Sequence, residues 1–537
     1  MPDSTSWKLT SRSFWAIAFL IILFFGLIRF RLRDMPLERD EGEYAYAGQL
    51  MLQGIPPYQF AYNMKLPGTY AAYAVVLAIF GETPAAIHCG LLIVNAATTF
   101  LVILLARRLF GCWSGLVAGA SYALLSTSPT VLGFAGHATH FVVLPALAGI
   151  LLLPVGAELR SKWRIAVSGM LLGLAFLMKQ PGIAFVCFGV AWLAWSHSKP
   201  RWKSIREIAL LLGGAAVPFA WTCILLFKAG VFDQFWFWVF SYGSQYGSAI
   251  KPLDGLLLLA GTLPAVIGTT APIWAIAAVG AFAIVRHRRW EAFFPLAFLA
   301  FSFLAVCAGL HFRSHYFILL LPAVSILAGA AMAIGPTDAR PILKPALVLS
   351  AFALALLFGR NFLFRMNPVE AARSVYGANP FPEAMELANY LRQTSRRDSR
   401  IAVFGSEPEI YFYSDRRSAT GYIYAYGLVE PQKYARRMQQ EMAREIERSQ
   451  PEYFIYVRCP LSWLKSGKSD PWIFAWADQY LNNRYELVDP QPGDGKRQLL
   501  VYRRRDKPNV AQVSNQVAYC LWTKSADASS RAVGSVQ

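Results

Sequence analysis

The sequence predicts a polytopic α-helical membrane protein that carries an extracytoplasmic α/β domain at its C-terminal side. Of the 537 residues, 55% are hydrophobic and 15% are charged, whereas a soluble domain is about 45–50% apolar and about 25% charged. The charge is also uneven, because residues 1–360 contain 39 charged residues and the shorter stretch 361–505 contains another 39. This composition excludes a soluble enzyme of this size and a disordered chain.

Eleven apolar stretches predict helices that cross a bilayer, for which about 18–20 residues are needed. We place them at roughly 13–30, 84–106, 114–130, 138–157, 164–178, 182–197, 207–227, 264–285, 291–310, 316–334 and 343–360. Residues 66–80 are apolar but number only 15, so we expect them on or partly in the outer interface. We expect Pro264 to separate a surface segment from the span that follows it.

Basic residues predict the orientation of these spans. With the N-terminus in the cytoplasm, the inner loops contain 16 Lys and Arg residues, and the outer side contains 5 when the first outer loop is left out. This positive-inside pattern explains much of the net charge of +19 without nucleic acid as a partner. Eleven spans then place the C-terminal domain outside the cytoplasm, and we expect a bacterial inner membrane.

The C-terminal residues alternate between strand and helix patterns. The predicted strands are 400–404, 453–457 and 497–503, and the predicted helices are 431–449 and 472–482. We therefore expect a multi-span domain over 1–372, whose first outer loop covers about 31–83. An α/β domain over 373–505 follows, and residues 506–537 are expected to form a disordered tail.

Acidic residues gather in the first outer loop. Five of the 13 acidic residues in positions 1–360 lie there within ten positions, namely Asp34, Glu38, Asp40, Glu41 and Glu43. From Asp40 the sequence has helical character and stops at Gly54. Carboxylates beside a bilayer are suited to act as a general base or a metal ligand for a lipid-borne substrate. The alternative is a solvated amphipathic helix in which Arg39 pairs with Glu43.

Three sequence elements lie on the outer side of the predicted topology. They are Asp40-Glu41 with Ala47–Tyr58 and Lys65-Leu-Pro-Gly68, then Lys179-Gln-Pro-Gly182, then His311-Phe-Arg313-Ser-His315-Tyr316 through Pro322. In this order they resemble the integral-membrane GT-C glycosyltransferases. The nearest group is the glycosyltransferase 39/83 type, which includes protein O-mannosyltransferases and lipid A aminoarabinose transferases. Lys65-Leu-Pro departs from the Lys-Pro-Pro of the aminoarabinose transferases, which leaves the sugar and the acceptor open.

The resemblance implies a GT-C architecture over residues 10–360 and a polyprenyl-phosphate sugar donor. The acceptor would be a lipid, a glycan or a protein. Asp40 would act on the acceptor as a base or would hold a divalent cation, Mg²⁺ or Mn²⁺, while the anomeric carbon is attacked with inversion. Glu41 would be a second ligand or an orienting group.

Cations near the leaving phosphate would stabilise its developing charge. The candidates for binding the donor phosphate are Lys65, Lys179, Arg313 and His315. The alternative for the lysines is that they only extend from a helix end to the membrane interface.

Two other classes of protein stay open at this point. A transporter or lipid flippase is expected to show inverted repeats and charges at mid-bilayer, and a receptor is expected to work through its soluble domain. Arg29, Arg31 and Arg33 either hold anionic lipid headgroups or anchor the first span. His137 and His140 are a weaker candidate for a metal site.

Overall fold

A computed structural model of the chain describes residues 9–155, 161–195, 201–287, 293–333, 343–488 and 498–505. The chain divides into two compact units. The first unit contains Met1–Asp34, His88–Ile224 and Ile250–Asn367, and the second contains Met35–Ile87, Leu225–Ala249 and Pro368–Gln537.

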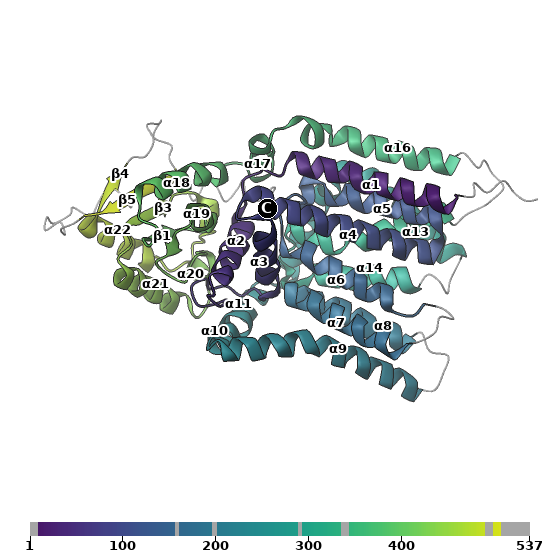
Figure 1. Cartoon of the computed structure of the whole chain (residues 1–537), viewed down its shortest axis with the longest axis horizontal. Coiled ribbons are helices and arrows are strands. Elements are labelled where there is room, and N and C mark those ends of the chain that lie inside the picture. Colours follow the sequence, from purple (N-terminus) through teal and green to yellow (C-terminus); the bar gives the residue numbers. More distant parts are fainter. Residues whose placement is uncertain are drawn as a thin grey trace, which may run out of the picture. The chain divides into compact units, whose positions relative to one another are not determined.

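The first unit is a bundle of helices that lie side by side (Figure 1). Its helices are α1 (Ser11–Arg31), α4 (Pro84–Phe110), α5 (Cys112–Ser126), α6 (Ala138–Leu152), α7 (Lys162–Met178), α8 (Ile183–Trp195), α9 (Arg201–Lys228), α12 (Pro252–Ile267), α13 (Ala271–His287), α14 (Phe293–Val306), α15 (Leu321–Ala333) and α16 (Leu343–Phe358). Short turns η1 (Pro129–Val131), η2 (Gln180–Gly182), η4 (Gly268–Thr270), η5 (Ala308–Leu310), η6 (Ser314–Leu319) and η7 (Asn361–Arg365) connect or extend them.

Small residues let these helices approach closely. A Cβ added at Gly329 of α15 would lie 2.4 Å from the carbonyl oxygen of Ser114 in α5. At Gly280 of α13 it would lie 1.9 Å from the carbonyl oxygen of Leu327. Such close backbone contacts are typical of helix packing in membranes, where the hydrophobic effect does not drive helices together.

Each of the eleven predicted spans coincides with one or two helices of this unit. Among the described residues, four helical segments are long and apolar enough to cross a membrane by length and composition, namely Ser11–Arg31, Pro84–Phe110, Trp202–Lys228 and Pro252–Arg286. The remaining apolar helices are shorter, so the count of eleven stays a prediction.

The predicted boundary at Pro264 is wrong. Pro264 lies inside α12, and the helix is interrupted four residues later at Gly268. Gly268 has a φ of 28°, a conformation that glycine adopts without the steric cost of a Cβ. The proline costs one backbone hydrogen bond but does not end this helix.

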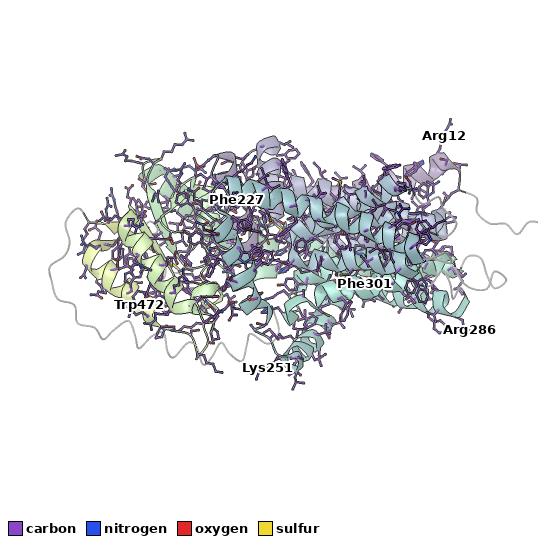
Figure 2. All side chains as sticks on the ribbon, turned by 90° about the horizontal axis from the view of Figure 1, so that it is seen from below. Arg12, Phe227, Lys251, Arg286, Phe301 and Trp472 are labelled. Atoms are coloured by element: carbon purple, nitrogen blue, oxygen red, sulfur yellow. The ribbon has the colours of Figure 1, made fainter. Side chains whose placement is uncertain are left out.

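Charged residues mark two ends of the helical unit. Figure 2 shows Arg12 and Arg286 at one end of it and Lys251 away from that end. Arg12 and Arg286 belong to the predicted cytoplasmic loops and Lys251 to a predicted outer loop; which end faces the cytoplasm stays a prediction.

The second unit contains a mixed five-stranded sheet with the strand order β2-β1-β3-β5-β4. The strands are β1 (Arg400–Phe404), β2 (Arg417–Ser418), β3 (Tyr453–Val457), β4 (Tyr485–Val488) and β5 (Leu499–Arg504). Strand β1 pairs in parallel with β2 and β3, and β5 pairs antiparallel with β3 and β4. Every residue of β3 is buried, as expected for a central strand that is covered on both faces.

The other described elements of the second unit are helices and helical turns, some of which lie beside the sheet (Figure 1). They are α2 (Arg39–Leu52), α3 (Gly68–Phe80), α10 (Phe232–Trp236), η3 (Phe237–Tyr242), α11 (Gly243–Gly247), α17 (Pro368–Tyr376), α18 (Phe381–Thr394), α19 (Glu409–Ser414), α20 (Tyr426–Val429), α21 (Ala435–Ser449), η8 (Pro460–Ser462) and α22 (Trp472–Arg484). The predicted strands at 400–404 and 453–457 and the helix at 472–482 are confirmed. The predicted helix at 431–449 begins four residues late, at Ala435.

The two units differ from the predicted linear division at residue 372. The first outer loop belongs with the C-terminal residues because α2 packs directly on α19. A Cβ at Gly42 would lie 2.5 Å from the backbone nitrogen of Glu409, and the Tyr46 hydroxyl accepts a hydrogen bond from the backbone nitrogen of Ser418 at 2.8 Å. The predicted disordered tail, 506–537, lies outside the described residues.

Candidate active site

The acidic segment of the first outer loop forms the start of α2. Glu38 and Glu41 make a capping box, in which Glu38 accepts a hydrogen bond from the Glu41 backbone nitrogen at 2.9 Å and Glu41 accepts one from the Glu38 backbone nitrogen at 3.2 Å. Such a box satisfies backbone donors that a helix start leaves unpaired. Glu41 is 1% exposed, whereas the side chain of Asp40 is 17% exposed. Asp40 is therefore the accessible carboxylate of this pair.

Lys65 joins Asp40 to a second carboxylate, Glu43. Its Nζ lies 2.7 Å from Asp40 Oδ1 and 2.6 Å from Glu43 Oε2. Glu43 is fully buried and also accepts hydrogen bonds from the Tyr70 hydroxyl at 2.6 Å and from Asn63 Nδ2 at 2.7 Å. The sequence placed Asp40 and Lys65 in the site, and the structure adds Glu43 as the second carboxylate that Lys65 contacts.

Burial and charge act against each other in this cluster. Burial raises the pKa of Glu43, the positive charge of Lys65 opposes that rise, and the negative charge of Asp40 adds to it. Burial alone would lower the pKa of Lys65, but the charges of Asp40 and Glu43 outweigh it and raise that pKa well above its ordinary value. Lys65 is therefore a permanent ammonium that faces two carboxylates. The sequence prediction placed it on the donor phosphate instead.

Local hydrogen bonds fix the loop that carries Lys65. The Tyr58 hydroxyl donates to the Lys65 carbonyl oxygen at 2.7 Å, and the Met64 backbone nitrogen donates to Asn63 Oδ1 at 2.7 Å. Pro67 then stands at the N-terminal boundary of α3. Asn at a turn and Pro at a helix start are the residue types that these positions favour.

Tyr424 reaches the same cluster from the C-terminal part of the second unit. Its hydroxyl donates to Asp40 Oδ1 at 3.2 Å. Lys65 Nζ lies 5.4 Å from the centre of the Tyr424 ring and 4.4 Å from that of Tyr44, distances at which an ammonium is attracted to an aromatic face. The sequence analysis missed Tyr424, because no local pattern signals a contact across 384 residues.

Arg39 makes a second ion pair, next to Asp40 in the sequence. Its Nη2 lies 2.8 Å from Glu407 Oε1, and the two side chains are 6% and 0% exposed. Arg39 also donates to the Ser406 carbonyl oxygen at 2.6 Å and to Asn379 Oδ1 at 3.0 Å. The alternative of a solvated helix with an Arg39–Glu43 pair is therefore wrong, since both side chains are buried with other partners.

The remaining predicted phosphate ligands lie in the first unit. Lys179 follows α7, and its Nζ lies 4.2 Å from the centre of the Tyr316 ring. The His315 ring stacks on His137 with centroids 4.1 Å apart and the planes 10° apart. Arg313 precedes the turn η6 that carries His315 and Tyr316. The structure thus gathers Lys179 and His315 around Tyr316 and adds His137 to them.

Two of the three arginines at the end of the first span have structural partners. Arg29 is 6% exposed and donates to the carbonyl oxygens of Ser126 at 2.6 Å and Gly133 at 2.8 Å. Arg31 donates to carbonyl oxygens in η7. For Arg29 the headgroup alternative is wrong, because its guanidinium is enclosed by the protein. Arg33 is half-buried; it packs on the Phe30 ring and lies 3.6 Å from Asp34 Oδ2.

The carboxylates of the second unit offer the oxygen ligands that Mg²⁺ and Mn²⁺ prefer. Lys65 Nζ, however, already lies within 2.7 Å of one oxygen of Asp40 and one of Glu43. A divalent cation between these two oxygens would have to displace the ammonium. Asp40 remains the candidate ligand, with Lys65 as a positive charge beside it.

Solved structures of two glycosyltransferases match the fold of this chain. ArnT from Cupriavidus metallidurans bound to undecaprenyl phosphate matches with a TM-score of 0.57 and 15% identity, covering 95% of this chain and 100% of that one. The oligosaccharyltransferase AglB from Archaeoglobus fulgidus, in complex with an inhibitory peptide and a dolichol-phosphate, matches with a TM-score of 0.52 and 13% identity, covering 93% of this chain and 75% of that one. The chain thus has the GT-C fold of an integral membrane protein, and the predicted resemblance is confirmed.

Part of the chain also matches the model of a protein family. Residues 65–225 match the dolichyl-phosphate-mannose-protein mannosyltransferase family. This stretch includes Lys65 and Lys179 and begins after Asp40. A comparison with curated protein sequences gives no match.

Proposed function

We propose that this protein is a membrane glycosyltransferase that takes a sugar from a polyprenyl-phosphate carrier. The GT-C fold and the family match over residues 65–225 support this class. The carrier is proposed because the ArnT and AglB structures contain undecaprenyl phosphate and a dolichol-phosphate. The acceptor would be a lipid, a glycan or a protein on the extracytoplasmic face. The N-terminus would then lie in the cytoplasm of a bacterial cell and the C-terminal region outside it.

The accessible, ion-paired carboxylate of Asp40 carries the mechanistic part of this proposal. We assign Asp40 as the general base, which takes the proton from the acceptor hydroxyl as that oxygen attacks the anomeric carbon. The bond between the anomeric carbon and the phosphate oxygen breaks at the same time, with inversion. The polyprenyl phosphate leaves with the electron pair of that bond, and the proton stays on Asp40.

Lys65 and Glu41 support Asp40 in this proposal. The Lys65 ammonium stabilises the ionised form of Asp40 and fixes one of its oxygens at 2.7 Å. Glu41 secures the start of α2 through the capping box and so orients the turn that carries Asp40. Asp40 as a metal ligand is the second candidate role, and dependence on a divalent cation distinguishes the two.

We propose that Lys179, Arg313 and His315 bind the donor phosphate. The leaving phosphate gains negative charge in the transition state, so fixed cations and hydrogen-bond donors lower the barrier. The grouping of Lys179 and His315 around Tyr316 in the first unit supports this assignment. Single substitutions of these residues are expected to raise the KM for the donor and to lower kcat.

A panel of polyprenyl-phosphate sugars tests the proposed function. Purified full-length protein in detergent or nanodiscs is incubated with each radiolabelled hexosyl and pentosyl donor, together with an extract of membrane lipids and glycans. We expect at least one donor to release polyprenyl phosphate in an acceptor-dependent reaction. Movement of lipid across a vesicle membrane with no sugar transfer would favour the transporter or flippase alternative.

A further inference from the structure

Tyr424 brings a side chain from the C-terminal region onto the Asp40 carboxylate. Its hydroxyl donates to Asp40 Oδ1 at 3.2 Å, and the same oxygen accepts from Lys65 Nζ at 2.7 Å. The Tyr424 ring also lies within reach of the Lys65 ammonium, at 5.4 Å from its centre. Tyr424 therefore contacts both members of the ion pair that we place in the reaction.

The protonation state of the Tyr424 hydroxyl allows it to donate a hydrogen bond. Burial, followed by the negative charge of Asp40, raises the pKa of Tyr424 well above its ordinary value. The phenol therefore keeps its proton at neutral pH and can donate it to a carboxylate. The residue as a whole is half-buried.

Glu445 of α21 ties the Tyr424 segment to the loop that carries Lys65. Its Oε2 accepts hydrogen bonds from Thr420 Oγ1 at 2.6 Å and from the Gly421 backbone nitrogen at 2.9 Å. Its Oε1 accepts from the Tyr62 hydroxyl at 3.0 Å, and the Tyr62 backbone nitrogen donates to the Gly421 carbonyl oxygen at 2.7 Å. One carboxylate thus connects both segments that meet at Asp40.

Two further contacts hold the chain on the C-terminal side of Tyr424. The backbone nitrogen of Ala425 donates to Ser406 Oγ at 2.9 Å, and the Tyr424 ring packs edge-on against Tyr426 with centroids 4.8 Å apart. The segment is held before and after Tyr424. Fixed supports of this kind hold a reacting group in its productive geometry.

We propose that Tyr424 is a positioning residue that the C-terminal region supplies to the Asp40 base. The inference rests on the proposed function of Asp40 and extends it, because it gives the C-terminal region a direct part in the reaction. The Tyr424 hydroxyl and the Lys65 ammonium together orient the Asp40 carboxylate.

Tyr424→Phe tests the role in the reaction, since it removes the hydroxyl and keeps the ring. We expect kcat for sugar transfer to fall by about tenfold or more, with the KM for the donor within about twofold. Tyr422→Phe is the matched control, because the Tyr422 hydroxyl donates to Glu441 at 3.0 Å. An unchanged kcat in Tyr424→Phe, a rise in KM alone, or an equal loss in both variants overturns the proposal.

A double-mutant cycle on thermal unfolding tests the contact without activity. Tyr424→Phe, Asp40→Asn and the double variant are compared by their melting temperatures in detergent, with Tyr422→Phe as the control partner. We expect Tyr424 and Asp40 to be coupled, so that their combined shift differs from the sum of the single shifts. Additive shifts overturn the proposal. Coupling without any sugar transfer by the wild type would refute the proposed function, and with it the positioning role, while leaving the contact in place.

Discussion

Two ion pairs begin at consecutive residues of α2 and differ in their access to solvent. Arg39 and Glu407 are 6% and 0% exposed, whereas Asp40 and Lys65 are each 17% exposed. A buried pair loses its hydration, and breaking it leaves an uncompensated charge. A pair at the surface of a site is open to a substrate that can exchange a proton with it. We infer that the first pair holds α2 in place and that the second is used for chemistry.

The hydrogen-bond partners of the two ion pairs also differ. Arg39 binds the Ser406 carbonyl oxygen and Asn379 in addition to Glu407, so its guanidinium is fixed by the C-terminal region. Asp40 is held through Lys65 and Tyr424, whose polar groups meet at one carboxylate oxygen. Changes to the first pair should therefore affect stability, and changes to the second should affect turnover.

Removing the buried guanidinium should have the largest effect on stability. Arg39→Met leaves Glu407 buried without its cation, which costs about 3–5 kcal/mol. We expect a large drop in the melting temperature of the detergent-purified protein. Arg436→Met is the control, because Arg436 pairs with Asp470 on the surface, and it should leave the melting temperature almost unchanged. Equal shifts in both variants would contradict the structural role of the Arg39 pair.

Removing the accessible ammonium of Lys65 should lower kcat. Lys65→Met leaves Asp40 and Glu43 without the charge between them, and we expect kcat to fall about a hundredfold, as for the loss of one electrostatic stabiliser. Lys65→Arg should recover part of this loss, because it restores the charge with a different shape. Initial rates with the best donor measure both. A Lys65→Met enzyme with wild-type kcat would show that the pair is structural.

A protonated carboxyl beside the buried pair should give the protein a pH-dependent stability. Glu409 is fully buried, and its carboxyl oxygens have no hydrogen-bond partner among the described residues. Burial, and then the charge of Glu407, raises the pKa of Glu409 well above its unfolded value of 4.5, although Arg39 opposes the shift. The folded state therefore holds a proton that the unfolded state releases, and this contribution to stability is full below pH 4.5 and falls as the pH rises above it.

Glu409→Gln measures this contribution, since the amide does not titrate. The melting temperature of the variant minus that of the wild type should increase between pH 5 and pH 8, by a few °C. A difference that is constant over this range would mean that Glu409 is ionised in the folded protein.

Removal of divalent cations should have the smallest effect. Because Lys65 already supplies a positive charge between Asp40 and Glu43, we expect a chelator to change the rate of transfer by less than about twofold. Rates are compared before and after treatment with EDTA and after addition of Mg²⁺ or Mn²⁺. A complete loss that Mn²⁺ or Mg²⁺ restores would assign Asp40 as a metal ligand instead of a base.

Local patterns were sufficient to predict much of the fold. The apolar runs at 400–404 and 453–457 gave the correct bounds of β1 and β3, because buried strands are short and rich in β-branched and aromatic residues. The two-residue strand β2 was missed, since its pairing is defined by a neighbour and not by its own sequence. Pro264 was over-interpreted because the packing of neighbouring residues can retain a helix around a proline.

The candidate site was predictable only where its residues are close in sequence. The concentration of carboxylates indicated the loop, and the family motif within that loop singled out Asp40 and Lys65. Glu407 and Tyr424 were not found, because they reach α2 from more than 360 residues away. The union of the first outer loop with the C-terminal region was missed for the same reason, as it depends on contacts such as the one between Gly42 and Glu409.

Sugar transfer by Asp40→Asn tests the central claim most directly. The amide keeps the size of the side chain but cannot accept the acceptor proton as a base does, and loss of general-base catalysis typically costs about 10²–10⁴-fold. Asp34→Asn is the matched control from the same loop, with a side chain that is 58% exposed. We predict that Asp40→Asn folds with a normal elution profile and transfers sugar at least about a hundredfold more slowly, while Asp34→Asn keeps wild-type turnover. Wild-type turnover in Asp40→Asn would contradict the role of Asp40.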